Sequence, residues 1–226
     1  MPYRILRATM VVLALAATAG RGSADFITNT PAWNGSDSIA AFGEPNTATY
    51  GQTITVGTDH FLNSFSFNLA SFRGAKVDFQ AYVYAWDGSK ASGPALYTSA
   101  ANSLAAGSNS YVNFSYNTGG INLTTGSQYV LFLNASNQFD GFSGDAKFGF
   151  TYSSTYNGGD FYYLNNGPTF SQVTSTDWSK VSDGDLAFTA SLSPTGSGIP
   201  TPLPPTLLAG FLGMAMLAGV RRLRRA

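Results

Sequence analysis

The sequence predicts an all-β protein, an antiparallel two-sheet sandwich with a jelly-roll-like order of strands. Three observations predict this fold class. Short runs rich in aromatic and β-branched residues recur between clusters of Gly, Asn, Asp and Ser. Several of these runs alternate apolar and polar residues, as half-buried antiparallel strands do. Outside the two chain ends, no stretch keeps the periodicity of a helix. A single closed sheet is the alternative architecture.

The expected strands follow one another along residues 25–194. The clearest covers residues 61–69, where one face carries Phe61, Phe65, Phe67 and Leu69 and the other carries Ser64, Ser66 and Asn68. Residues 185–192 alternate in the same way. Further strands are expected at residues 53–56, 77–86, 95–99, 111–116, 128–133, 147–150 and 160–164. Pairs such as Asp-Gly, Gly-Gly and Gly-Pro separate them and predict turns.

The N-terminus predicts export. Arg4 and Arg7 precede an apolar stretch at residues 8–19, and small residues follow, which is the pattern of a secretory signal peptide. We expect cleavage after Ala24, with Ala19 as the alternative, and the secretion translocon and signal peptidase as partners. The predicted organisation is a signal peptide at 1–24, one sandwich domain at 25–194, and a linker with a sorting segment at 195–226.

Charge is distributed unevenly between the ends and the body. Residues 25–194 hold all 12 acidic residues but only five of the 12 basic ones, a net charge of −7, although the whole chain is neutral. An acidic body argues against nucleic acid and anionic lipid as partners. It suits a soluble exported domain or a calcium binder. Cysteine is absent, so stability has to come from the core, and about 170 residues suffice for one.

The C-terminal tail has three parts in a fixed order. A proline-rich hinge at 200–205 precedes an apolar run at 206–220, and the run ends in an arginine cluster: Arg221, Arg222, Arg224 and Arg225. As a helix the run is about 22 Å long, short of the ~30 Å hydrocarbon core, so it is a marginal membrane span. The arginines act as a cytoplasmic stop and place the body outside. Proline keeps the hinge extended, as a protease or transpeptidase requires.

In this order of parts the tail resembles PEP-CTERM sorting signals, which membrane enzymes called exosortases read. Pro202, Leu203 and Pro204 stand where the family motif has Pro-Glu-Pro, similar to its Pro-Leu-Pro variants, and the match covers about 27 of 226 residues. The resemblance implies an exosortase-like membrane transpeptidase as partner. It further implies transient anchoring in the inner membrane by the C-terminal helix, then transfer to the cell surface or extracellular matrix, with exopolysaccharide and biofilm. A permanent tail anchor is the alternative.

Residues 77–86 carry the most informative pattern of the body. Strand alternation puts Gln80, Tyr82, Tyr84 and Trp86 on the face opposite the core, where aromatic rings beside polar groups can stack on sugars. This predicts a candidate glycan-binding face, and with it a secreted carbohydrate-binding module as the alternative function. A covering loop or cross-strand aromatic pairs explain the same pattern without a ligand.

Other candidate chemistry is sparse. Asp183 and Asp185 flank a glycine and can present carboxylates to calcium, although no full twelve-residue calcium loop surrounds them and a turn with a charge at the strand edge is the favoured explanation. His60, the single histidine, has no nucleophile-elbow pattern near any serine. Two Asp residues can serve a glycosidase, which leaves a secreted hydrolase as the less favoured alternative. We therefore expect a non-enzymatic exported protein without a cofactor.

Overall fold

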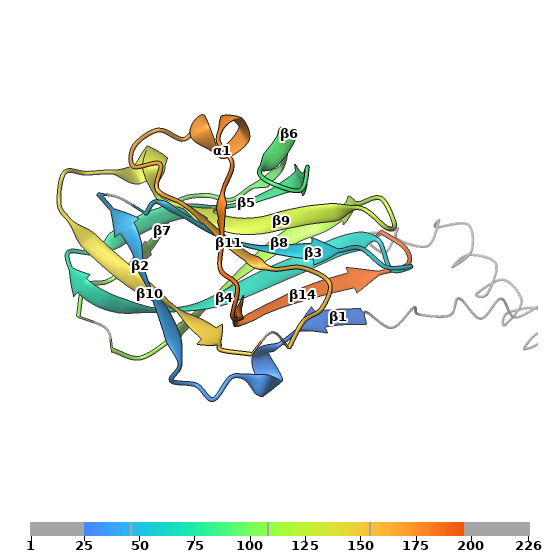
Figure 1. The fold of residues 1–226 in the computed structure, drawn as a ribbon, viewed down its shortest axis with the longest axis horizontal. Coiled ribbons are helices and arrows are strands. Elements are labelled where there is room, and N and C mark those ends of the chain that lie inside the picture. The colour runs from blue at the N-terminus through green and yellow to red at the C-terminus, as the bar shows by residue number, and fades with distance from the viewer. Residues whose placement is uncertain (1–24, 46, 108, 154, 197–226) are drawn as a thin grey trace, which may run out of the picture.

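The computed structural model describes residues 25–196, apart from 46, 108 and 154. The predicted signal peptide and the C-terminal hydrophobic helix lie outside the described residues. Within them, two antiparallel sheets pack face to face, which confirms the prediction of an all-β sandwich (Figure 1). No helix in this part of the chain is long and apolar enough to cross a membrane.

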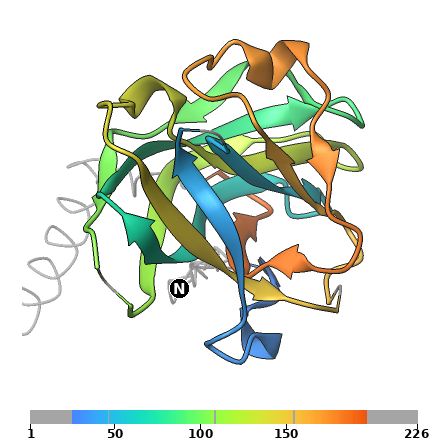
Figure 2. The same cartoon turned by 60° about the vertical axis from the view of Figure 1, so that its left-hand side comes forward.

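The first sheet is built around one long strand. Its members are β1 (Asp25–Thr28), β2 (Ser38–Glu44), β4 (Phe61–Gly74), β8 (Val112–Asn122), β10 (Gly144–Thr151), β13 (Asp185–Leu186) and β14 (Phe188–Ser193). The first part of β4 pairs with β14 and β8, and its last part pairs with β10. β10 in turn pairs with β2, and Figure 2 shows these two strands running side by side. β4 thus connects the two ends of the sheet.

The second sheet carries β9 and β5 at its centre. Its members are β3 (Thr49–Thr55), β5 (Val77–Trp86), β6 (Ala91–Thr98), β7 (Asn102–Leu104), β9 (Gln128–Asn134), β11 (Phe161–Leu164) and β12 (Ser179–Lys180). Three short helices lie in connections: η1 (Thr30–Ala32), η2 (Ser136–Gln138) and α1 (Gln172–Ser175). Neighbouring strands such as β3 and β9 are far apart in sequence, so the sheet forms only when distant segments meet.

The core between the sheets is rich in phenylalanine. Phe42, Phe67 and Phe148, all from the first sheet, are fully buried, and the Phe148 ring lies 5.2 Å from that of Phe42 and 5.7 Å from that of Phe67. Phe79 of the second sheet meets Phe42 edge-on at 6.0 Å. Each such side chain contributes roughly 2–3 kcal/mol by its removal from water. In a chain without cysteine this packing holds the two sheets together.

Most expected strands are present, with one informative difference. The stretch expected as a single strand at 185–192 is divided at Ala187 into β13 and β14. β13 pairs with β10, whereas β14 pairs with β4, so the chain changes partner at this residue. Alternation of side chains continues through the change because both partners belong to the same sheet. β1 and β2 were not expected, since their sequences alternate weakly.

The first and the last strand of the described residues lie side by side. β1 pairs antiparallel with β14, and Asp25 lies opposite Leu192 (Figure 1). The first residue after the expected signal-peptide cleavage and the last strand before the linker are therefore neighbours.

Candidate functional site

The predicted sorting residues lie outside the described residues. These are Pro202, Leu203 and Pro204 of the motif and Arg221, Arg222, Arg224 and Arg225 of the membrane stop. The site that the structure can place is therefore one on the sandwich body.

The candidate glycan face on β5 is covered, which agrees with the alternative reading in which a loop packs over these rings. Tyr82, Tyr84 and Trp86 are only 4%, 7% and 8% exposed. Gln80 is half-buried, and its amide oxygen accepts hydrogen bonds from the Tyr82 hydroxyl at 3.0 Å and from Gln138 Nε2 at 3.2 Å. In this arrangement no ring face of the three aromatics is open to a sugar.

The covering segment runs from β11 through α1 to β12 and forms a second, smaller core on the outer face of the second sheet (Figure 1). Tyr82 stacks on Phe132 at 5.1 Å, and Trp86 meets Trp178 edge-on at 5.4 Å. The Trp178 indole donates to the Val173 carbonyl at 2.9 Å, which fixes it within the segment. Alternation correctly indicated which way the β5 side chains point, but it carries no information about what packs over them.

The two calcium candidates do not converge. Asp183 is exposed in a turn, whereas Asp185 is fully buried. Gln52 Nε2 donates to the Asp185 carboxylate at 3.0 Å, and Gln52 Oε1 accepts from the Leu186 amide at 3.0 Å. Asp185 thus belongs to a buried hydrogen-bond network that joins β3 to β13. Among the described residues no group of three His, Cys, Asp or Glu side chains is placed to hold a metal ion.

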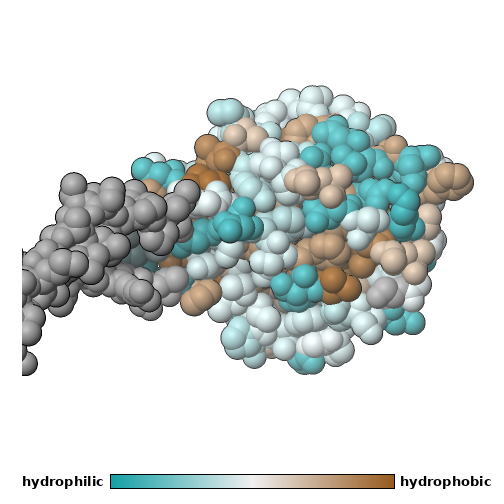
Figure 3. Space-filling model, turned by 180° about the vertical axis from the view of Figure 1, so that it is seen from behind, coloured by the Kyte–Doolittle hydropathy of each residue, from teal (hydrophilic) through white to brown (hydrophobic). Residues whose placement is uncertain are grey.

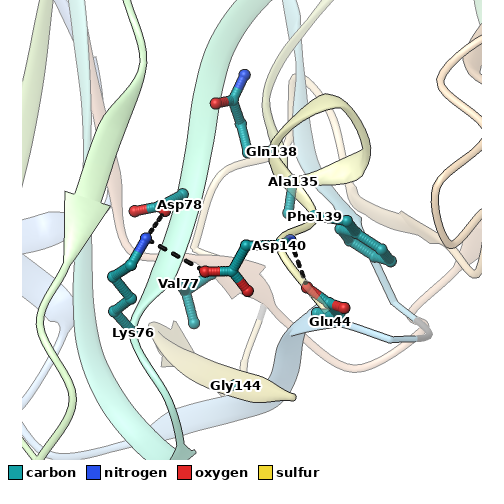
Figure 4. Close-up of a pocket in the computed structure, with 9 residues that line it drawn as sticks. All are labelled: Glu44, Lys76, Val77, Asp78, Ala135, Gln138, Phe139, Asp140 and Gly144. Carbon is teal, nitrogen blue, oxygen red and sulfur yellow. Dashed lines mark hydrogen bonds and ion pairs between the residues drawn. The ribbon is translucent and has the colours of Figure 1, made fainter. Parts of the chain in front are cut away.

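A small pocket lies where β5 begins, and four charged side chains line it: Glu44, Lys76, Asp78 and Asp140 (Figure 4). Lys76 forms ion pairs with Asp78 and, at 3.4 Å, with Asp140. The Glu44 carboxylate accepts the backbone amides of Asp140 and Gly141, both at 3.1 Å. The enclosed volume is about 10 Å³, room for a single water. These contacts hold the loop after η2 against β2 and β5. We call the four charged side chains the brace.

A cleft with a volume of about 570 Å³ lies on the outer face of the first sheet. It is lined by Trp33, Gly35, Ser36, Asn68, Asn109, Ser110, Tyr111 and Lys147. Asn68 of β4 and Lys147 of β10 point outward because their neighbours Leu69 and Phe148 are fully buried in the core. The floor of the cleft is thus sheet, and its wall is the loop after η1.

The two aromatic rings of the cleft are held in place by specific contacts. The Trp33 indole donates to the Asp37 carbonyl at 2.8 Å and lies against Gly149, where a Cβ atom would come within 2.8 Å of its Cζ2. Tyr111 meets Trp33 edge-on at 4.7 Å. The Asn34 side-chain oxygen accepts the Ser36 and Asp37 amides at 2.9 and 2.8 Å, which fixes the loop. The site is therefore built before any ligand arrives.

Charge in the cleft comes from Lys147. Its ammonium lies 5.6 Å from the centre of the Tyr111 ring, a cation–π contact. Within the described part of the chain, every other lysine and arginine forms an ion pair with a carboxylate, and Lys147 forms none. Burial raises the pKa of the Tyr111 hydroxyl, so this ring is neutral at physiological pH. The cleft combines aromatic rings, amides and hydroxyls with one positive charge that forms no ion pair.

A second opening of about 300 Å³ lies where β2 of the first sheet faces β3 and β11 of the second. Tyr50, Phe161 and Tyr163 line it together with Ile39 and Val181. Burial raises the pKa of Tyr50, with a smaller contribution from neighbouring Tyr163. Among the described residues no charged side chain lines this opening, and it offers fewer polar groups than the cleft.

Comparisons with known proteins add little to this geometry. No family model matches the chain, and no curated protein matches it. A solved structure of the cysteine protease and lectin-like domains of Cwp84, a surface layer associated protein of Clostridium difficile, is similar over 66% of this chain at a TM-score of 0.42 and 14% identity. The chain spans about a third of that protein, 32% of its length. A likeness this distant carries no argument about function.

Sequence reasoning did not find the cleft. Its residues come from four segments, around Trp33, Asn68, Tyr111 and Lys147. A local signal that could have indicated a fixed loop beside an aromatic ring is the Asn-Gly-Ser turn after Trp33. The meeting of these segments follows from the pairing of β4 with β8 and β10 and could not be read from spacing.

Proposed function

We propose that this chain is an exported, non-enzymatic protein of the cell surface or extracellular matrix, sorted by its C-terminal PEP-CTERM-like signal. One structural observation carries the proposal. Asp25, the residue after the expected signal-peptide cleavage site, pairs with Leu192, which lies just before the expected linker. The proposed cleavage on either side leaves every described strand in the body.

The proposed route follows from the predicted ends of the chain. The translocon exports the chain, signal peptidase cleaves after Ala24, and the apolar segment at 206–220 holds the protein in the inner membrane. An exosortase-like transpeptidase then acts near Pro202-Leu203-Pro204 and transfers the body outward, where exopolysaccharide is its expected surrounding. The adjacency of β1 and β14 supports this route, because a body attached at one edge leaves its opposite parts accessible.

The proposal includes two finer points about the body. A jelly-roll-like order of strands is supported by the pairing of segments distant in sequence, as between β3 and β9 or β4 and β14. A non-catalytic role is supported by the brace around Lys76, whose carboxylates are engaged in ion pairs and whose Glu44 accepts backbone amides.

The deciding experiment is the intact mass and C-terminal sequence of the mature protein isolated from its native host. We expect a chain that begins at Asp25 and lacks the apolar segment and the arginines. The double variant Pro202→Ala/Pro204→Ala should accumulate in the inner membrane with its tail attached, whereas Pro194→Ala, outside the motif, should be processed normally. A mature wild-type protein that still ends at Ala226 would show a permanent anchor and refute the sorting proposal.

A further inference from the structure

The cleft beside Trp33 has the chemical composition of a sugar-binding site. Its two aromatic rings, Trp33 and Tyr111, are partly exposed and are fixed by hydrogen bonds and by contact with Gly149. Sugar rings pack their C–H faces on aromatic rings while their hydroxyls bond neighbouring amides and hydroxyls. Asn68 and Ser36 supply such groups at the cleft.

A track of small polar side chains extends from this cleft along the outer face of the first sheet. Strand register places them in rungs across β8, β4, β14 and β1: Asn113–Asn68, then Ser115–Ser66–Thr189–Thr28, then Asn117–Ser64–Ser191. From Asn68 to Ser64 the track is about 14 Å long, at 3.4 Å per residue. A run of amides and hydroxyls of this length can bond several successive sugar units of a polymer.

Lys147 restricts the kind of polymer. It is the one lysine or arginine of the described residues without an ion pair, and it stands over the Tyr111 ring inside the cleft. An ammonium group in this position favours a ligand that brings a carboxylate. The body as a whole carries a net charge of −7, which opposes a densely charged polyanion such as nucleic acid. A sugar chain with spaced carboxylates meets both conditions.

Protein partners fit the same surface less well. The face of the molecule opposite to the view of Figure 1 mixes hydrophilic residues with apolar ones (Figure 3). The rungs beside the cleft are Ser, Thr and Asn, residue types that are not enriched in the centres of protein interfaces.

We propose that the cleft of Trp33, Tyr111, Asn68 and Lys147 binds an acidic polysaccharide, with a sugar ring against the aromatic pair and its carboxylate on the Lys147 ammonium. The neighbouring units of the polymer follow the polar rungs of β4 and β8. This binding does not depend on the sorting signal, so it can fail or succeed independently of the proposed route to the surface.

The test measures binding of the purified full chain in mild detergent to oligosaccharides of polygalacturonate, alginate and hyaluronan. Each acidic oligosaccharide is compared with its carboxyl-reduced, uncharged counterpart. We expect at least one acidic oligosaccharide to bind roughly tenfold more tightly than its reduced form, the size of one charge-assisted hydrogen bond. Absence of binding to all three, or equal binding of acidic and reduced forms, overturns the proposal.

Single substitutions separate the contribution of the Lys147 charge to oligosaccharide binding from that of the Tyr111 ring. Lys147→Met should lose about tenfold in affinity for the acidic ligand and little for the reduced one, and Lys147→Arg should retain binding, because the charge is kept. Tyr111→Ser should weaken binding of both forms. Lys180→Met and Phe142→Ser are matched controls, since Lys180 is paired with Asp160 and Phe142 is 69% exposed outside the cleft.

Folding is checked on the same samples by the denaturant midpoint of each variant. Lys147→Met replaces an outward-facing side chain by one of similar length, so a midpoint close to wild type is expected. An Lys147→Met protein that folds normally and binds acidic oligosaccharide as tightly as wild type contradicts the assignment of the carboxylate to Lys147.

Discussion

At the scale of single residues, Tyr116 on β8 stands out because its hydroxyl is buried. The ring is 5% exposed and packs 5.1 Å from Phe65, and among the described residues its oxygen is the one buried side-chain polar atom without a hydrogen-bond partner. A buried hydroxyl without a partner costs free energy.

Removing this hydroxyl should therefore not weaken the fold. We expect Tyr116→Phe to leave the free energy of unfolding unchanged or to raise it by up to about 1 kcal/mol, measured by denaturant titration. Tyr116→Ala, which also removes the ring, should cost roughly 3–5 kcal/mol. A clear loss in the Phe variant would mean that the hydroxyl has a bonding partner in solution.

Alkaline pH should destabilise the protein through its buried tyrosines. Burial raises the pKa of Tyr50 and of Tyr116 above the ordinary value of 10.0. Below about pH 10 both are protonated in the folded and unfolded chain, so their contribution is fully present. Above that pH only the unfolded chain loses the protons, and stability falls by up to about 1.4 kcal/mol per pH unit for each tyrosine. Unfolding midpoints measured between about pH 8 and 11 should show this decline, and the Tyr50→Phe/Tyr116→Phe double variant should show a flatter profile.

The buried network around Asp185 predicts a large effect of one amide. Gln52→Leu removes the donor to the Asp185 carboxylate and the acceptor of the Leu186 amide at once. We expect the free energy of unfolding to fall by about 3 kcal/mol, because two buried polar groups lose their hydrogen bonds to Gln52 at once. Gln128→Leu, an exposed glutamine on β9, is the matched control and should change it by less than about 0.5 kcal/mol. Equal effects of the two substitutions would argue against the network.

At the scale of elements, the segment from β11 to β12 turns the outer face of β5 into a second core. Its central side chain is Trp178, which is 5% exposed and contacts Trp86 and Phe132. Because of this segment, the three aromatics of β5 are structural. They contribute to stability, as in the alternative reading of the sequence pattern in which a loop covers them.

Truncating that tryptophan should loosen the second core. Trp178→Ala is expected to cost roughly 3–5 kcal/mol of unfolding free energy and to increase the accessibility of Tyr82 and Trp86 to a fluorescence quencher. Phe142→Ala, at a site 69% exposed, should change neither quantity appreciably. Wild-type stability in the Trp178 variant would show that the segment packs loosely on the sheet.

Strands were predictable from the sequence to the extent that one face of each is buried and the other is not. Residues 65–69 satisfy this condition along β4, and the prediction for them is confirmed. A register shift between Leu62 and Ser64 puts Leu62 in the core in place of Phe61, which the alternation did not indicate. The division of 185–192 at Ala187 was not readable, because a change of partner within one sheet leaves alternation intact. The cleft could not be predicted for a related reason. Trp33, Tyr111 and Lys147 come together only through the order of the strands in the sheet, and the spacing of residues along the chain does not indicate that order.

At the scale of the whole molecule, the adjacency of β1 and β14 sets how the body tolerates processing. We expect a chain truncated after residue 196 to unfold with the same denaturant midpoint as the full chain in detergent, because every described strand lies before that point. Removal of Asp25–Thr28 should instead lower the midpoint, since β1 covers the edge of β14 and the Thr28 hydroxyl bonds the Phe188 carbonyl at 2.9 Å. Equal midpoints for the two truncations would show that β1 adds no stability.

The same adjacency determines how the body carries mechanical load. β14 leads to the linker, and it is hydrogen-bonded on both sides, to β1 and to β4. A pull on the linker against a polymer held near Asn68 therefore acts along the strands. The hydrogen bonds of β14 to β1 and β4 run perpendicular to the strands, so such a force loads them all at the same time. We expect a domain attached through this strand to need a higher force to unfold. In an attachment that pulled on the tip of a hairpin, the hydrogen bonds would break one after another at a lower force.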